Sequence, residues 1–387
     1  MDTQKLDQTY IANTYARFPV TIVKGKGSLV WDDTGKEYID LSTGIAVDIF
    51  GVADEEWVAA VTKQLGTLQH ISNLYYTEPC VKLAQMLCEK TGMKRVFFGN
   101  SGAEANECAI KAARKWSEEK KGKDYSTIIT LKNSFHGRTI TTLAATGQDV
   151  FHHDFTPLTE GFVYAEPNDL ADLEQLIKAN KCAAVMMEVV QGEGGVMPLD
   201  EAYVKGAAKL CEQYDLLLIC DEVQVGNGRS GKLYGYMHYG VQPDIVSTAK
   251  GLAGGLPLGA TLLGEKVQDV LSAGTHGSTF GGNPVCCAGA INVLSRLDEK
   301  MLEGVEERSA YIKQELTGAK GVLGVSGLGL MLGIQTEKNA SDIIAACREK
   351  GVLVIKAKDK LRLLPALNIP MEQLQKAVAV IKACCAE

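Results

Sequence analysis

Short apolar runs alternate with longer amphipathic stretches through the middle of the chain. The runs lie at 95–99, 127–131, 183–190, 216–220 and 244–249. Apolar runs of this length, separated by helical patterns, are typical of buried parallel strands joined by helices. The pattern therefore predicts an α/β protein with a large, mostly parallel sheet.

Four further segments complete this predicted sheet domain. Helical periodicity indicates helices at 103–121, 169–180 and 201–214, which would connect and cover the strands. Another apolar run at 259–264 follows a short glycine turn. A turn of that length cannot hold a helical crossover, so we expect this strand to run antiparallel to its neighbour.

Both ends of the chain depart from this rhythm. Residues 20–40 are typical of short strands with turns, and after about residue 290 the pattern changes to a long helix followed by mixed strands and helices. We expect the two ends to form a second, smaller α+β domain. The predicted division is an N-terminal part of the small domain at 1–55, a large domain at 56–290 and the rest of the small domain at 291–387.

The composition excludes several classes of protein. Of the 387 residues, 46% are hydrophobic and 22% charged, with a net charge of −7 and no long basic run, which argues against nucleic acid as a partner. No apolar stretch is long enough to span a membrane, and the first residues lack an export pattern, so we expect a cytoplasmic location. Eleven cysteines without any CxxC pair favour free thiols over disulfides or a structural metal.

Polar, aromatic or glycine residues follow five of the predicted strands. In chain order they are "NSGAEA", "KNSFHGRT", Glu188 with "QGEGG", "DEVQVGNG", and Lys250. In open α/β sheets, ligands bind beyond the carboxyl ends of the strands. We therefore expect these five segments to form one site.

The first two segments offer groups for a phosphate and for a flat ring. Ser101 and Glu104 have the spacing of a capping box, and the small residues Gly102 and Ala103 leave the start of that helix open to an anion. Phe135 is either a core aromatic or a platform that stacks on a ring.

The remaining candidates are charged. Arg138 is either a surface cation or a clamp for a carboxylate. Asp221 either forms a structural salt bridge or holds a cationic ligand such as a pyridinium nitrogen. Lys250 lies among Ala, Gly, Leu, Pro, Ser and Thr, where it either reaches water along its stem or stays dry as a neutral nucleophile. A phosphate site, an aromatic plate, a carboxylate and a dry lysine are together the requirements of pyridoxal phosphate (PLP).

With these groups in this order, the chain resembles the class III (ω-) aminotransferases of PLP fold type I. The resemblance implies PLP as cofactor, no metal, and a large sheet domain of the seven-stranded type with a smaller α+β domain made from both chain ends. It covers almost the whole chain, and its lysine, "DEVQ" and "HGSTFGGNP" blocks are specific in combination. The matching blocks are "GIAV" (44–47), "SNLYYTEP" (72–79), "FFGNSGAEANECAIKAARK" (97–115), "SFHGRTITTLAATGQ" (134–148), "QGEGGV" (191–196), "CDEVQVGNGRSGKL" (220–233), "PDIVSTAKGLAGGLPLGA" (243–260) and "GTHGSTFGGNP" (274–284).

The resemblance assigns cofactor roles by position. Lys250 would carry the cofactor and act as the base that moves a proton between the substrate and the cofactor. Asp221 would keep the pyridine nitrogen protonated, Gln224 would hydrogen-bond the ring hydroxyl, and Phe135 would stack on the ring. The implied cofactor-binding residues are Gly102, Ala103, Phe135, Asp221, Glu222, Val223, Gln224, Lys250 and Thr279.

The resemblance also assigns substrate roles. Arg138 would bind the α-carboxylate of both substrates, and Ser278 would line the side of the acylated amine. Glu193 and Arg362 match a charge switch, in which Glu193 covers Arg362 for the amine donor and releases it for a substrate with a distal carboxylate. Tyr15 lies near the substrate tail in relatives.

The implied active unit is a homodimer, in which Ser278 and Thr279 reach the site of the partner subunit. The implied reaction converts N2-acetyl-L-ornithine and 2-oxoglutarate into N-acetyl-L-glutamate 5-semialdehyde and L-glutamate, a step of arginine biosynthesis. Ornithine, succinylornithine and 4-aminobutyrate are the alternative amine donors.

One stretch departs from the family pattern, and another, which lies inside a matching block, imitates a different class of protein. "FGVADEEW" stands where relatives commonly have "GHxHP". "GNGRSG" at 226–231 also satisfies the GxGxxG pattern of dinucleotide-binding proteins, which makes an NAD-dependent oxidoreductase the distant alternative. That alternative is weakened because "DEVQ" separates the glycines from the strand and the residues after them are poor helix formers.

Overall fold

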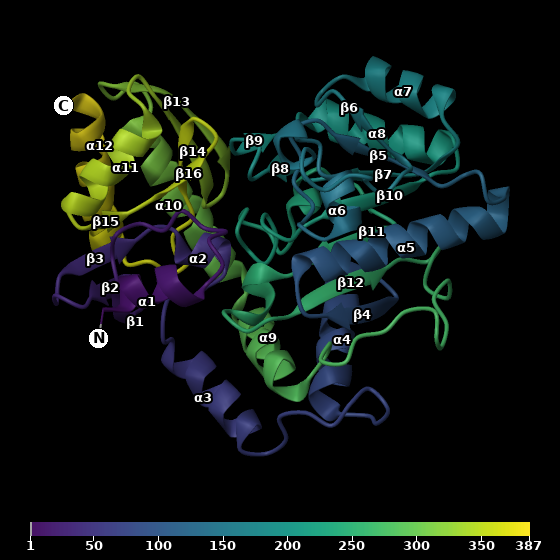
Figure 1. Cartoon of the computed structure of the whole chain (residues 1–387), viewed down its shortest axis with the longest axis horizontal. Helices are drawn as coiled ribbons and strands as arrows, with labels where there is room; N and C mark the ends of the chain where they lie inside the picture. The colour runs from purple at the N-terminus through teal and green to yellow at the C-terminus, as the bar shows by residue number, and fades with distance from the viewer. Residues whose placement is uncertain (1) are drawn as a thin grey trace.

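A seven-stranded sheet forms the centre of the large domain in the computed structural model, which describes residues 2–387 (Figure 1). The strand order is β4-β12-β11-β10-β7-β5-β6. β12 runs antiparallel to both of its neighbours, as predicted, and the other pairings are parallel. The strands are β4 (Arg95–Gly99), β5 (Thr127–Leu131), β6 (Phe162–Ala165), β7 (Cys182–Met187), β10 (Leu217–Asp221), β11 (Ile245–Thr248) and β12 (Gly259–Leu263).

Helices cover this sheet, so its central strands are buried on both faces and do not show an alternating pattern. Every residue of β7 and β10 is buried, as expected for parallel strands with both faces covered. The helices of this part of the chain are α3 (Glu55–Leu65), α4 (Glu78–Thr91), α5 (Gly102–Lys121), α6 (Ile140–Ala145), α7 (Leu170–Ala179), α8 (Glu201–Gln213) and α9 (Pro284–Arg296).

Helix α5 begins with the N-cap that the sequence predicted. The Ser101 hydroxyl accepts a hydrogen bond from the Glu104 N–H at 3.1 Å. The Glu104 carboxylate reaches one residue further back than in a standard capping box, because it accepts the Asn100 N–H at 2.5 Å. Both bonds fix the point at which the chain leaves β4 and turns into the helix.

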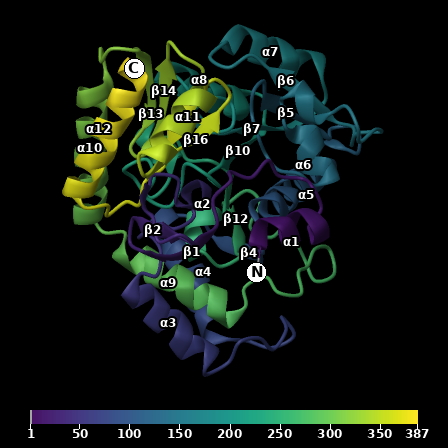
Figure 2. The ribbon, with the colours of Figure 1, turned by 60° about the vertical axis from the view of Figure 1, so that its left-hand side comes forward.

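The small domain contains segments from both ends of the chain, which lie together at the left of Figure 1 and remain adjacent in Figure 2. β15 from the C-terminal part of the chain pairs in parallel with β3 from the N-terminal part, and Val352 lies opposite Ile39. One four-stranded sheet has the order β1-β2-β3-β15 and the other β13-β14-β17-β16. The strands are β1 (Ile22–Lys26), β2 (Leu29–Asp32), β3 (Glu37–Asp40), β13 (Val322–Leu328), β14 (Met331–Thr336), β15 (Val352–Leu353), β16 (Ile355–Ala357) and β17 (Lys360–Leu363).

Five further helices belong to the chain ends: α1 (Thr3–Tyr10), α2 (Thr43–Ala46), α10 (Glu299–Leu316), α11 (Ala340–Glu349) and α12 (Met371–Ala386). The single long helix expected after residue 290 is two helices, α9 and α10. Asp298 separates them and caps α10 by accepting the Met301 N–H at 2.8 Å. The predicted domain border at 290/291 falls inside α9.

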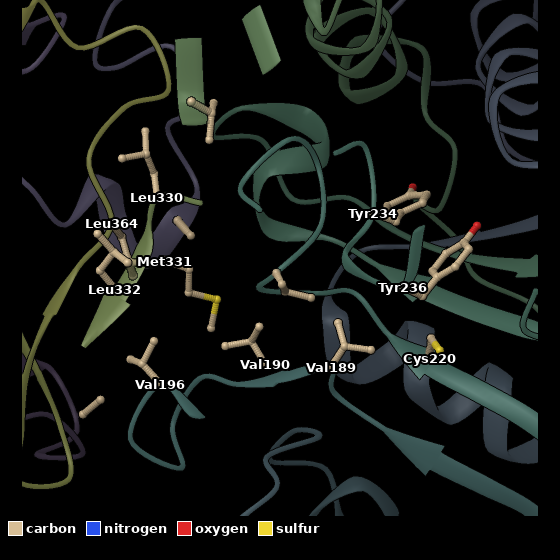
Figure 3. Packing of buried hydrophobic residues seen from close by; sticks show 14 of the residues in the cluster. Val189, Val190, Val196, Cys220, Tyr234, Tyr236, Leu330, Met331, Leu332 and Leu364 are labelled. Atoms are coloured by element: carbon tan, nitrogen blue, oxygen red, sulfur yellow. The ribbon is translucent and has the colours of Figure 1, made fainter. Parts of the chain in front are cut away.

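Hydrophobic packing continues from the large sheet into the small domain. After β7 the chain forms a short hairpin of β8 (Val190–Gln191) and β9 (Met197–Pro198). Figure 3 shows Val190 and Val196 from this hairpin across from Met331 and Leu332 of β14, all of them buried. The two domains therefore share one hydrophobic core, which holds them together at their junction. Within residues 2–387, no helix is both long enough and apolar enough to cross a membrane.

Candidate active site

A pocket of about 240 Å³ lies beyond the carboxyl ends of the strands of the large sheet. The segments that follow β4, β5, β7, β10 and β11 all contribute to it, which is the convergence that the sequence predicted. Its lining residues are Gly102, Ala103, Asn106, Phe135, His136, Gly137, Arg138, Glu188, Asp221, Val223, Gln224 and Lys250.

Asp221, the last residue of β10, is buried and held by three donors. Its Oδ2 accepts hydrogen bonds from Asn106 Nδ2 and, with His136 protonated at Nδ1, from that nitrogen, both at 2.8 Å. Its Oδ1 accepts the Val223 N–H at 3.0 Å. Such a set of donors stabilises a carboxylate and fixes its direction. A cationic N–H on a ring in the pocket is the complementary partner.

Lys250 lies two residues after the end of β11 and begins a 3-10 turn, Lys250–Ala253. The turn is tightly packed, because a Cβ on Gly251 would lie 2.4 Å from Cδ1 of Ile49. Burial lowers the pKa of the Lys250 ammonium, although the nearby charge of Glu193 opposes this effect. A lowered pKa increases the fraction of neutral amine, which is the nucleophilic form.

The start of α5 forms a second wall of the pocket. Gly102 and Ala103 are its first residues, and the first N–H groups of a helix have no partner within that helix. A Cβ on Gly102 would lie 2.6 Å from Cγ1 of Val223, so only glycine permits this approach. The wall presents backbone donors and the positive end of the helix dipole, which together suit a phosphate.

An aromatic and cationic cluster lies beside these groups. The Phe135 and Phe151 rings have centroids 5.9 Å apart and cross at 75°. The guanidinium carbon of Arg138 lies 4.2 Å from the Phe151 centroid and 5.4 Å from the Phe135 centroid. Arg138 is exposed, so its N–H groups remain accessible to a carboxylate.

Buried Arg362 of β17 and partly exposed Glu193 form an ion pair at the junction of the domains. Arg362 is only 2% exposed, and its Nη1 lies 2.5 Å from Oε1 of Glu193. Gln224, which lines the pocket, accepts a hydrogen bond from Arg362 at 3.0 Å and donates one to Glu193 at 3.3 Å. Burial alone would raise the pKa of Glu193, but the charge and hydrogen bonds of Arg362 hold that pKa below its usual value.

The side chain of Glu222 is not part of the pocket lining, although the resemblance grouped Glu222 with the cofactor-binding residues. Its carboxylate accepts the N–H groups of Gly235 at 2.7 Å and Tyr236 at 2.9 Å. Burial raises the pKa of Glu222 to about 8. Within this subunit the side chain therefore supports the loop that follows "DEVQ".

Ser278, Thr279 and Tyr15 also lie outside the pocket lining of their own chain. The Ser278 hydroxyl accepts a hydrogen bond from Asn100 Nδ2 at 3.1 Å, and Thr279 is exposed. Tyr15 is 70% exposed, with the Arg17 guanidinium carbon 5.1 Å from its ring centroid.

Sequence reasoning missed Asn106 and His136, the two side chains that hold Asp221. Asn106 is 1% exposed and interrupts an otherwise apolar face of α5 that includes Ala105 and Ala109. A buried amide in such a stripe is a signal that could have identified it, because buried polar groups need partners. His136 lies next to the predicted stacking residue, but its sequence position does not reveal the direction of its ring.

Glu188 also lines the pocket without having been assigned a role. It accepts the N–H groups of Phe135 at 2.8 Å and Gly192 at 3.2 Å. Burial raises the pKa of Glu188, and His136 nearby opposes the shift. These bonds tie the loop that carries Phe135 to the segment after β7.

The donor set of this pocket fits PLP. It combines an oriented buried carboxylate, an open helix start with a glycine that allows close approach, an aromatic ring, and a lysine with a lowered pKa. By contrast, "GNGRSG" is followed by a 3-10 turn, Gly235–His238, instead of the α-helix that a dinucleotide site requires, and Arg229 within it is buried.

Comparisons with known proteins agree with this chemistry. The family model "Aminotransferase class-III" matches residues 10–385. The acetylornithine aminotransferase of Haemophilus ducreyi is 50% identical, over 99% of this chain and 98% of that protein. The succinylornithine transaminase of Salmonella newport is 43% identical, over 97% and 94%. A structure of the ornithine aminotransferase of Toxoplasma gondii, described with partial occupancy of PLP at its active site, superposes with a TM-score of 0.94 at 34% identity, over 99% of this chain and 93% of that one.

Proposed function

Because the chain belongs to the class III aminotransferases, we propose that its amine donor is N2-acetyl-L-ornithine and its acceptor 2-oxoglutarate, with N-acetyl-L-glutamate 5-semialdehyde and L-glutamate as products. The chain is an aminotransferase, and PLP is its cofactor. The Glu193–Arg362 pair carries the acceptor half of this proposal, because it offers a cation that is hidden for the amine donor and available for a dicarboxylate. The donor half rests on the 50% identity to the acetylornithine aminotransferase of Haemophilus ducreyi.

The residues proposed to hold PLP are those that line the pocket. Asp221 pairs with the pyridine nitrogen, Phe135 stacks on the ring, the N–H groups of Gly102 and Ala103 bind the phosphate, and Lys250 binds the carbonyl carbon. Bound in this way, the cofactor supplies an electron sink that stabilises negative charge on the substrate carbon next to the reacting amine. Val223 and Gln224 border the ring, and the Gln224 amide suits its hydroxyl group.

Lys250 is the proposed base of the reaction. Its neutral amine takes the proton from the amine-bearing carbon of the donor and returns it on the cofactor side of the same pocket. The Asn106 and His136 hydrogen bonds to Asp221 hold the opposite end of the site fixed during this transfer.

Arg138 and Arg362 are the proposed carboxylate sites. Arg138 is accessible beside the pocket and binds the α-carboxylate of either substrate. Arg362 stays paired with Glu193 while the amine donor is bound, and it turns to the distal carboxylate when 2-oxoglutarate or glutamate enters. Gln224 contacts both members of the pair, so it supports Arg362 in either arrangement.

Replacement of Arg362 by Gln is expected to raise KM for 2-oxoglutarate by about ten- to a hundredfold, because a hydrogen bond to a charged group contributes about 1.5–3 kcal/mol. KM for the amine donor should change much less, since that substrate does not use the cation. Steady-state kinetics with each substrate varied separately measure both values. Lys356→Gln, which removes an exposed cation on β16, is the control, and equal increases for both substrates would contradict the switch.

A homodimer with shared sites is part of the proposal. Ser278 and Thr279 lie outside their own chain's pocket, and Thr279 is exposed, which suits residues that complete a partner's phosphate and substrate sites. Tyr15, which is 70% exposed, is proposed at the substrate tail because of its position in relatives. The domain division and a cytoplasmic location remain predictions from the sequence.

The experiment that tests the substrate is a single half-reaction without a keto acid. The protein saturated with PLP is mixed with N-acetylornithine, succinylornithine, ornithine or 4-aminobutyrate, and the absorbance of the bound cofactor is followed. We expect N-acetylornithine to react at least about tenfold faster than ornithine, because a site built for an acyl amide leaves polar groups unpaired when that amide is missing. Faster reaction with ornithine would indicate an ornithine aminotransferase, as the Toxoplasma relative is named. Faster reaction with succinylornithine would indicate a succinylornithine transaminase, as the Salmonella relative is named.

A further inference from the structure

The Phe151 ring lies closer to the guanidinium of Arg138 than the Phe135 ring of the pocket does. The guanidinium carbon lies 4.2 Å from the centre of the Phe151 ring, compared with 5.4 Å from that of Phe135. Phe151 is not among the residues that line the pocket. We propose that Phe151 is a positioning residue, which holds Arg138 ready to bind the substrate carboxylate; this rests on the carboxylate role of Arg138 proposed above.

Arg138 needs such a support because no ion pair among the described residues holds it and the Phe135 ring is further away, at 5.4 Å. The ion pairs found within residues 2–387 do not include Arg138, and its side chain is exposed. An exposed arginine samples many rotamers, and fixing one of them on binding costs conformational entropy. An aromatic face under the guanidinium reduces that cost through a cation–π contact. No ion pair within residues 2–387 uses the Arg138 guanidinium, so its N–H groups remain available for two parallel hydrogen bonds to a carboxylate.

The loop that carries Phe151 is itself firmly attached to the site. Phe151 ends a 3-10 turn and donates its N–H to the Gln148 carbonyl at 3.0 Å. The Gln148 side chain donates to the Ser134 carbonyl at 2.9 Å, and the Gly147 N–H donates to the Ser134 hydroxyl at 3.0 Å. Ser134 directly precedes Phe135. The two rings therefore lie on loops that are tied together at one point.

The contact between the rings adds a second constraint. Phe151 meets Phe135 edge to face, with an angle of 75° and centroids 5.9 Å apart. This geometry is favourable for aromatic pairs. Phe151 thus links the residue proposed to stack on the cofactor to the residue proposed to bind the substrate, and it sets the position of Arg138 relative to that ring.

Three variants and a non-reacting probe test the proposal. Phe151→Leu keeps apolar bulk but removes the aromatic face, Phe151→Tyr keeps the face, and Phe155→Leu removes a half-exposed ring four residues further on. The probe is glutarate, a dicarboxylate without a reactive carbonyl, titrated against the PLP-bound enzyme by the absorbance of the cofactor. KM and kcat for both substrates, the release of PLP on dialysis and the midpoint of thermal unfolding complete the measurements.

We expect Phe151→Leu to raise Kd for glutarate and KM for both substrates by a similar factor, about three- to tenfold, with kcat unchanged. Phe151→Tyr should restore the values of the parent protein, and Phe155→Leu should not depart from them. Unchanged glutarate binding in Phe151→Leu would overturn the inference, as would a loss explained entirely by a lower unfolding midpoint or by release of PLP.

Arg138→Ala in the same titration separates this inference from the function on which it rests. If Arg138→Ala weakens glutarate binding and Phe151→Leu does not, the role of Phe151 is wrong and the carboxylate site stands. If Arg138→Ala leaves glutarate binding unchanged, the carboxylate role of Arg138 is wrong and both proposals fail.

Discussion

Replacement of Lys250 by Ala is expected to reduce turnover by at least about a thousandfold while PLP still binds. A positioned general base contributes about 10²–10⁴ to the rate, and this variant also loses the nucleophilic amine. PLP binding persists because the phosphate wall at Gly102 and Ala103, Phe135 and Asp221 are untouched. The measurements are kcat in the full reaction and the PLP retained after dialysis.

Lys205→Ala is the matched control, since it removes an exposed lysine on α8 that forms only a surface ion pair with Glu201. Its activity should equal that of the parent protein. A Lys250→Ala variant that kept substantial turnover would show that another group moves the proton, and the proposed base would be wrong.

Asp221→Asn is the second substitution expected to have a large effect. The amide is neutral, so it cannot pair with a protonated pyridine nitrogen, and loss of such an electrostatic contact costs about 10²–10³ in kcat. The change also affects stability. If the Asn oxygen faces the donors Asn106 and His136, its NH₂ group faces the Val223 N–H, and if the oxygen faces Val223, the NH₂ group faces Asn106 and His136. One side is therefore left unsatisfied unless His136 changes its tautomer.

We therefore expect Asp221→Asn to lower the free energy of unfolding by about 1–3 kcal/mol in addition to the loss of activity. Urea unfolding and kcat at saturating PLP measure the two effects separately. Asp215→Asn, at an exposed carboxylate on the loop before β10, controls for the change of charge. Full activity in Asp221→Asn would contradict the pairing of this residue with the ring nitrogen.

The sequence predicted the large sheet well because its strands are buried on both faces and appear as continuous apolar runs. β6 (Phe162–Ala165) was missed, since it is short, lies at the edge of the sheet and is only partly buried. The run at 183–190 looked like one strand because Val189 and Val190 are also apolar. Val190 faces Met331 of the small domain and Val189 packs beside Gly235 of the loop after β10, and neither of these long-range contacts leaves a local signal.

The site was predictable wherever a strand end dictates the position of the next residue. Asp221 and Lys250 are examples, because Asp221 is the last residue of β10 and Lys250 lies two residues after the end of β11. The direction of a side chain after such an end depends on the following turn. Glu222 illustrates this limit, since it binds the Gly235 and Tyr236 amides although both of its neighbours line the pocket. Phe151 was missed for a related reason: its role comes from a contact across loops that the sequence does not encode locally.

The parallel pairing of β3 with β15 has a consequence for synthesis on the ribosome. Residues 37–40 find their partner only when residues 352 and 353 have been made. At about 5–20 residues per second, that interval is roughly 15–60 s. During this time the outer edge of β3 carries unpaired backbone groups, and such an edge is a site at which nascent chains can associate wrongly. The small domain can therefore be completed only after translation has passed the whole large domain.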